Sequence, residues 1–133
     1  MFEISKEISF DMGHRLSKHN GKCFNLHGHT YIVEVTLKGD TLTDVGYLID
    51  FTDIKTDLKE ITDILDHKTM LYKNDSINER IFNAVPNDCL MVDFEPTAEN
   101  IAKYIFEQME LKHSIISSVK IWETPTSYAI YKR

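Results

Sequence analysis

Long apolar runs are absent from this chain of 133 residues, and no segment approaches the roughly 18 uncharged apolar residues of a membrane-spanning helix. Residues 1–7 also lack the basic start and continuous apolar run of a signal peptide. Lys and Arg are scattered and the net charge is −6, so no basic stripe is available for a nucleic acid, although a few local cations would suffice for a small phosphorylated substrate. We therefore expect a cytoplasmic protein that binds neither membranes nor nucleic acids.

Cysteine is scarce: Cys23 and Cys89 are the only two thiols, too few for a disulfide framework. Cys89 lies within an apolar run and is typical of a core residue, whereas Cys23 lies in a polar loop four residues before a histidine pair. Repeats, linkers and low-complexity segments are absent as well. Because 42% of the residues are apolar and 27% are charged, residues 1–133 are predicted to form a single globular domain.

Two segments alternate between apolar and polar residues with the period of two that is typical of half-buried strands. The first covers residues 2–12, and His14 continues its apolar parity. The second covers residues 27–37. Because Asn20-Gly21 is a turn signal between them, we predict an antiparallel hairpin with a long loop.

Two later segments have the spacing of amphipathic helices. The first covers residues 51–65 after Asp50, which is a suitable N-cap, and the second opens at Pro96-Thr97. Between the helices we predict an irregular connection over residues 68–88 and a short strand at 89–94.

The order strand, strand, helix, connection, helix, strand, strand predicts an α+β domain, with the final strands near residues 119–123 and 128–131. In this arrangement an antiparallel four-stranded sheet carries two helices on one face. The other face must be covered too, and small domains often achieve this by oligomerising.

His27 and His29 are alternate residues of the second strand and therefore project from the same face. Gly28 adds no side chain between them, and His14 would supply a third imidazole from the neighbouring strand. Three neutral imidazoles leave one tetrahedral position open, which is the pattern of a catalytic zinc site. The alternative is a pair of polar residues at a strand entrance. Cys23 could be a fourth ligand that closes the site, or a thiol whose pKa the metal lowers.

Two further features carry acidic groups. Asp66-His67 follows the first helix, and a carboxylate–imidazole pair can orient a general base, although Asp66 could instead cap the helix. Glu123 has the inward parity of Val119 and Ile121, where a carboxylate needs a donor. That donor would be an amidine-like N–H pair of a ligand, or a Lys or Arg side chain.

Six short motifs span almost the whole chain. They are Phe10-Asp11-Met12-Gly13-His14-Arg15-Leu16, Cys23-Phe24-Asn25-Leu26-His27-Gly28-His29, Gly46-Tyr47-Leu48-Ile49-Asp50-Phe51, Leu65-Asp66-His67, Pro96-Thr97-Ala98-Glu99-Asn100 and Trp122-Glu123-Thr124. With these motifs in this order, the sequence resembles the 6-pyruvoyl-tetrahydropterin synthase family, which includes the bacterial 6-carboxytetrahydropterin synthases of queuosine biosynthesis. The resemblance implies the tunnelling fold (T-fold), in which trimers close their sheets into a barrel and two trimers stack into a homohexamer with active sites at subunit interfaces.

The resemblance also implies a role for each candidate residue. The ligands of a Zn2+ ion would be His14, His27 and His29. The acid–base thiol would be Cys23, activated by Asp66 and His67. Glu123 would hold the 2-amino and ring N–H groups of a pterin, with Thr97 lining the same pocket.

The spacing of three residues between Cys23 and His27 is similar to that of the 6-carboxy branch. This resemblance implies conversion of 7,8-dihydroneopterin triphosphate to 6-carboxy-5,6,7,8-tetrahydropterin, with release of acetaldehyde and triphosphate. The alternatives are elimination of triphosphate to 6-pyruvoyltetrahydropterin, and a non-catalytic module that binds zinc or pterin. Cys23 argues against an aldolase branch of the family, in which a glutamate tends to serve near this position.

The connection over residues 68–88 departs from the familiar short version of the family, in which a Leu-Asn pair soon follows Leu-Asp-His. This segment bears on substrate choice. Candidate cations for the substrate's phosphates are Arg15, Lys18 and Lys22.

Overall fold

A long antiparallel hairpin forms the centre of the sheet in the computed structural model, which describes residues 1–133. β1 (Phe2–His14) pairs with β2 (His27–Gly39) residue for residue along its whole length. The apolar parity is buried at Phe10, Met12 and His14 of β1 and at Tyr31, Val33, Val35 and Leu37 of β2, so the predicted hairpin with a long loop is confirmed. Its register places His14 directly opposite His27.

Six strands form one mixed sheet in the order β4-β3-β1-β2-β5-β6. The other four strands are β3 (Lys68–Tyr72), β4 (Cys89–Val92), β5 (Ile116–Thr124) and β6 (Ser127–Lys132). β1, β2, β5 and β6 are antiparallel neighbours, whereas β3 and β4 extend the sheet beyond β1 in parallel. The prediction of a four-stranded antiparallel sheet is therefore wrong in the number of strands and in their direction.

β3 lies in the segment that was predicted to be irregular. Its fully buried residues Met70 and Leu71 are adjacent rather than alternate, and it pairs with β1 only from Met12 to His14. A short strand that is buried on both faces gives no period of two. The alternation rule therefore could not detect it.

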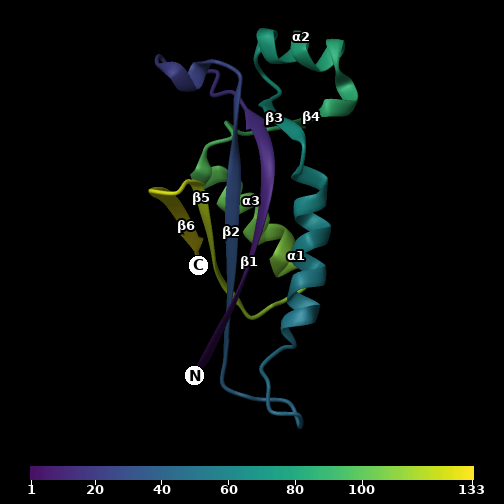
Figure 1. Cartoon of the computed structure of the whole chain (residues 1–133), viewed down its shortest axis with the longest axis vertical. Coiled ribbons are helices and arrows are strands. Elements are labelled where there is room, and N and C mark those ends of the chain that lie inside the picture. The colour runs from purple at the N-terminus through teal and green to yellow at the C-terminus, as the bar shows by residue number, and fades with distance from the viewer.

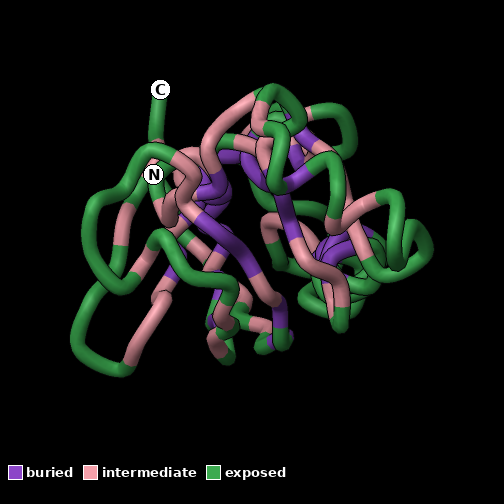
Figure 2. The backbone as a smooth tube through the Cα atoms, turned by 90° about the horizontal axis from the view of Figure 1, so that it is seen from above, coloured by how far each residue is buried: buried purple, intermediate pink, exposed green.

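α1 (Phe51–Leu65) and α3 (Ala98–Glu110) pack against the sheet and against each other, and both were predicted (Figure 1). Asp50 caps α1 by accepting a hydrogen bond from the Thr52 N–H at 2.8 Å. The buried residues gather in the interior of the molecule, and the outer parts of the chain are mostly exposed (Figure 2). The core includes Tyr31, Leu37, Ile54, Leu58, Ile101, Ile105 and Phe106.

A third helix, α2 (Ser76–Ala84), lies at one end of the molecule, beyond β3 and β4 (Figure 1). The prediction of two helices is therefore wrong. Asp75 caps α2, and Asn78 is the only buried residue of this helix, so α2 has no buried apolar face. A short 3-10 helix, η2 (Pro86–Asp88), connects α2 to β4. None of the helices has the length and apolar character needed to cross a membrane.

The face of the sheet that turns away from the core carries exposed polar side chains, including Glu7, Ser9 and Asp11 of β1. The sheet also has open backbone edges. β3 covers β1 only over residues 12–14, which leaves residues 2–11 without a strand on that side, and β6 ends the sheet on the other side. Open edges of this kind can pair with another chain.

Candidate metal and substrate site

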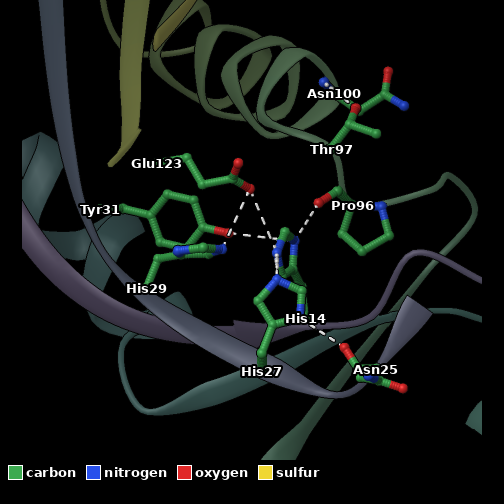
Figure 3. Close-up of polar contacts among 9 residues, drawn as sticks. All are labelled: His14, Asn25, His27, His29, Tyr31, Pro96, Thr97, Asn100 and Glu123. Atoms are coloured by element: carbon green, nitrogen blue, oxygen red, sulfur yellow. Dashed lines mark hydrogen bonds and ion pairs between the residues drawn. The ribbon is translucent and has the colours of Figure 1, made fainter. Parts of the chain in front are cut away.

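Three imidazoles converge at the loop end of the β1–β2 hairpin, on the inward parity of both strands (Figure 3). His14 is fully buried at the end of β1, and His27 and His29 are half-buried at the start of β2. One ring nitrogen of each histidine lies within 4.8 Å of the others. The structure thus brings together all three ligands that were predicted from the sequence.

Backbone carbonyl groups fix two of the rings. His14 Nδ1 lies 2.7 Å from the Pro96 carbonyl oxygen, and His27 Nδ1 lies 2.6 Å from the Asn25 carbonyl oxygen. Because a carbonyl oxygen can only accept, each Nδ1 carries a proton, and in a neutral ring the Nε2 atom is then a lone-pair acceptor. The two Nε2 atoms are 3.0 Å apart and cannot hydrogen-bond to each other in this state.

This donor set fits a metal ion. Facing lone pairs repel one another unless a cation lies between them, and imidazole nitrogens oriented through their other nitrogen are the usual ligands of zinc. Burial lowers the pKa of His14 and the pKa of His29. Both rings are therefore held in the neutral form that metal binding requires.

Glu123 lies beside the imidazoles (Figure 3). Its Oε1 atom is 3.4 Å from His14 Nε2 and 3.7 Å from His29 Nε2. The register between β5 and β6 shifts between Trp122 and Thr124, and such an irregularity re-aims the side chain at its centre. The inward parity predicted for Glu123 is confirmed. The Lys or Arg partner that the sequence left open is not found.

Glu123 is also shared by two pockets. One of about 210 Å³ is lined by Thr97, Leu16 and Tyr128 as well, and one of about 360 Å³ is lined by His29 and other residues of β2 and β5. Thr97 is the N-cap of α3, so the start of that helix forms a wall of the first pocket. Thr97 and Glu123 therefore line one pocket, and Glu123 also lies against His14 and His29.

Asp66 and His67 form a pair where α1 ends. His67 Nδ1 lies 2.9 Å from Asp66 Oδ2, and Asp66 Oδ1 accepts from the Asp11 N–H at 2.8 Å. His67 has a φ of 59°, in the left-handed region, at the junction between α1 and β3. The hydrogen bond to Asp66, reinforced by its charge, raises the pKa of His67. The Asp11 N–H and then the His67 ring lower the pKa of Asp66.

The Asp66–His67 pair lies on the outward side of the hairpin. His67 lines a pocket of about 440 Å³ with Asp11 and Thr30, whose parity is opposite to that of the imidazoles, and His29 also lines this pocket. Cys23 lies in the half-exposed 3-10 turn η1 (Lys22–Phe24) and belongs to neither cluster. A single chain thus does not assemble the three predicted catalytic side chains.

The three candidate phosphate-binding cations differ in their surroundings. The Arg15 guanidinium is buried and donates to Asp75 and Asn78, so it is not a free cation. Lys18 Nζ lies 5.5 Å from the centre of the Tyr72 ring. Lys22 remains exposed.

Several groups of the site were not predicted from the sequence. The carbonyl groups of Asn25 and Pro96 belong to the backbone, so residue type gives no signal for them. Tyr31 lies with its hydroxyl 3.3 Å from His14 Nδ1, and its pKa is raised by burial and then by the charge of Glu123. Tyr31 is two residues after His29 in the same strand, and this shared parity could have predicted that its side chain points into the site.

Known proteins of one family match this chain from end to end. A family model described as 6-pyruvoyl tetrahydropterin synthase matches residues 3–133. The 6-carboxy-5,6,7,8-tetrahydropterin synthase of Haemophilus influenzae is 41% identical, with 99% of each chain covered. The 6-pyruvoyl tetrahydrobiopterin synthase of Dictyostelium discoideum is 34% identical, with 97% of this chain and 94% of that protein covered. The structure of Caenorhabditis elegans 6-pyruvoyl tetrahydropterin synthase matches with a TM-score of 0.77 at 26% identity, covering 99% of this chain and 95% of that one. The chain belongs to the 6-pyruvoyl tetrahydropterin synthase family.

Proposed function

We propose that this protein is a zinc-dependent lyase of queuosine biosynthesis. It converts 7,8-dihydroneopterin triphosphate and water to 6-carboxy-5,6,7,8-tetrahydropterin, acetaldehyde and triphosphate. The observation that carries the proposal is the imidazole triad of buried His14 and half-buried His27 and His29, with Glu123 beside it, 3.4 Å from His14 Nε2. The similarity to a 6-carboxy-5,6,7,8-tetrahydropterin synthase at 41% identity favours this branch of the family.

Glu123 binds the pterin ring. A pterin presents its 2-amino group and a ring N–H side by side, and a carboxylate can accept from both in a two-pronged contact. Glu123 Oε1 also lies 3.4 Å from His14 Nε2 and 3.7 Å from His29 Nε2, so the pterin-binding carboxylate and the imidazoles are direct neighbours. Thr97 and Tyr128 line the pocket beside it.

The imidazoles hold zinc and leave one position for the substrate. When bound, zinc polarises the side-chain oxygens of the substrate and makes the protons on the neighbouring carbons easier to remove. Cys23, as a thiolate, takes and returns those protons. His67 receives the thiol proton and Asp66 stabilises the charged ring, in keeping with the raised pKa of His67.

The separation of the proposed catalytic residues within one chain requires a second subunit to complete the active site. Asp66 and His67 lie on the outward side of the hairpin, and Cys23 belongs to neither cluster within one chain, so we expect Cys23 of one subunit to meet Asp66 and His67 of the partner subunit. The open edge of β6 pairs with the open edge of β1 in the next chain, which closes three sheets into a barrel. Two such trimers form the homohexamer.

Product identification tests this proposal. The zinc-loaded protein is incubated with 7,8-dihydroneopterin triphosphate, and the products are identified by chromatography and mass spectrometry. We expect 6-carboxytetrahydropterin and acetaldehyde. Release of 6-pyruvoyltetrahydropterin without acetaldehyde would instead assign the chain to the other branch.

The Cys23→Ala variant separates an enzyme from a binding module. The variant is expected to keep its zinc and to lose turnover, because the thiol acts on the substrate and not on the metal. Loss of zinc would make Cys23 a ligand and close the position assigned to the substrate. Unchanged pterin affinity with no turnover in either protein would support a non-catalytic module.

A further inference from the structure

Arg15 directly follows the first proposed zinc ligand, yet it has no part in the proposed chemistry. Its side chain is almost fully buried, and Nη1 donates to Asp75 Oδ1 at 2.9 Å and to Asn78 Oδ1 at 3.0 Å. Nη2 is buried and has no hydrogen-bond partner in the chain. The desolvation of a buried ion pair offsets much of its attraction, so net stability alone is a weak reason for this arrangement.

On one side, the guanidinium organises the start of α2. Asp75 Oδ1 accepts from the Asn78 N–H at 3.0 Å, and the Asn78 amide donates to the Tyr72 carbonyl oxygen at 2.9 Å. Burial acts to raise the pKa of Asp75, but the Asn78 N–H and the Arg15 charge outweigh it, and the pKa of Asp75 is lowered. Because Asn78 is the only buried residue of α2, this polar network holds the helix in place.

On the other side, Arg15 reaches the turn that carries Cys23. Its Cζ atom lies 4.3 Å from the centre of the Phe24 ring, a cation–π contact. The next residue, Leu16, donates its N–H to the Cys23 carbonyl oxygen at 3.0 Å. The η1 turn has no buried residue and no side-chain cap, so contacts from residues 15 and 16 restrain it.

We propose that Arg15 is a positioning residue that couples α2 and its cap to the Cys23 turn, and thereby sets the place of the thiol. The turn and α2 lie at the same end of the molecule (Figure 1). The coupling itself depends only on the fold, and its effect on turnover rests on the proposed function. The 68–88 connection, which contains α2, therefore influences the position of the Cys23 thiol through the Arg15 guanidinium, without contributing a side chain to the reaction.

The Asp75→Asn variant tests this coupling. It removes the charge that faces Nη1 and leaves an oxygen to cap α2, while Cys23 and its neighbours in sequence stay unchanged. Iodoacetamide alkylation of the full-length protein, resolved by peptide mass spectrometry, gives the rate at Cys23 relative to Cys89. We expect this ratio to rise about 5-fold, the effect of weakening one cation–π contact. We expect kcat to fall by a similar factor, with KM and zinc content unchanged.

Phe24→Leu provides a second, independent variant at an exposed position, where folding is not at risk. This variant should raise the alkylation rate at Cys23 relative to Cys89 without changing hydrogen exchange in α2. Arg133→Lys is the matched control, because Arg133 also pairs with a carboxylate, Glu110, and lies over an aromatic ring, Phe106. This control should change neither the ratio nor kcat.

Two results would overturn the coupling. One is faster hydrogen exchange in α2 of Asp75→Asn with an unchanged Cys23 ratio, which would mean that Arg15 only anchors the helix. The other is an unchanged ratio in Phe24→Leu. If the ratios rise as expected but the unsubstituted protein does not turn over dihydroneopterin triphosphate, the coupling stands and the proposed function fails.

Discussion

The Nε2 atoms of His14 and His27 lie 3.0 Å apart, while the Nδ1 atom of each ring faces a backbone carbonyl oxygen. Each neutral ring therefore turns a lone pair toward the other, an arrangement that a bound cation stabilises. Glu123 adds negative charge on the same side, 3.4 Å from His14 Nε2. These three side chains are the centre of the proposed active site.

Replacement of His27 by Ala should abolish zinc binding. Loss of a group that merely orients a ligand weakens metal binding 10- to 100-fold, so loss of the ligand itself should exceed about 100-fold. Zinc content is measured by mass spectrometry after dialysis against buffered zinc. His113→Ala is the control, because His113 pairs with Asp57 at 2.7 Å and belongs to neither cluster of candidate ligands. Full zinc content in His27→Ala would mean that the triad is not the metal site.

Glu123→Gln should keep zinc and lose substrate affinity. The new amide N–H₂ group would face the donors of the pterin, and the two charge-assisted hydrogen bonds together contribute about 3 kcal/mol. This corresponds to a fall of about 100-fold in kcat/KM. Steady-state kinetics and zinc analysis on the same sample check it. Loss of zinc would identify Glu123 as a metal ligand instead.

Asp66→Asn should lower the pKa of His67 to its ordinary range, because the hydrogen bond and charge of Asp66 raise it in the native chain. A raised native pKa stabilises the fold below the ordinary histidine pKa, and this stabilisation is lost as the pH rises through the raised value. NMR titration of the His67 ring measures the shift. Asp63→Asn is the control, since Asp63 pairs with Lys59 on the same helix. An unchanged His67 pKa in Asp66→Asn would contradict the hydrogen bond between Asp66 and His67.

Alanine at Gly13 and alanine at Gly28 should both destabilise the hairpin, but one second substitution should rescue only the first. A Cβ atom on Gly28 would lie 3.2 Å from the Met12 carbonyl oxygen, which is backbone, whereas one on Gly13 would lie 2.9 Å from Thr69 Oγ1. Each alanine should cost about 1–3 kcal/mol in urea denaturation. Adding Thr69→Ala should restore most of the stability of Gly13→Ala and none of that of Gly28→Ala. Equal rescue of both would contradict the geometry.

The sequence predicts the parts of the fold whose burial is one-sided and periodic. The β1–β2 hairpin, α1 and α3 each bury one face, so their apolar residues recur with the period of the element. β3 has neighbours on both edges and buries adjacent residues, and α2 is held by Asn78 rather than by apolar side chains. β3 therefore shows no period of two, whereas α2 has helical spacing over only nine residues and leaves its apolar side chains exposed or half-buried, so its polar segment was predicted to be an irregular connection.

The candidate site also contains residues that a local pattern predicts and groups that depend on loop or tertiary structure. The three histidines were predictable because the parity of two strands places them on one face. The Asn25 and Pro96 carbonyl groups were not, since they depend on loop conformation. The placement of Asp66 and His67 on the other side of the hairpin follows from the end of α1 meeting the edge of β1, a tertiary contact without a local pattern.

Acetaldehyde release from 7,8-dihydroneopterin triphosphate, measured while metal-free protein is titrated with zinc, tests the role of the imidazole triad most directly. We predict no release without zinc, a rise to a plateau at about one zinc ion per chain, and no release from His27→Ala at any zinc concentration. Release of acetaldehyde by the metal-free protein, or turnover by His27→Ala at the unsubstituted rate, would contradict a zinc-dependent site at these three histidines.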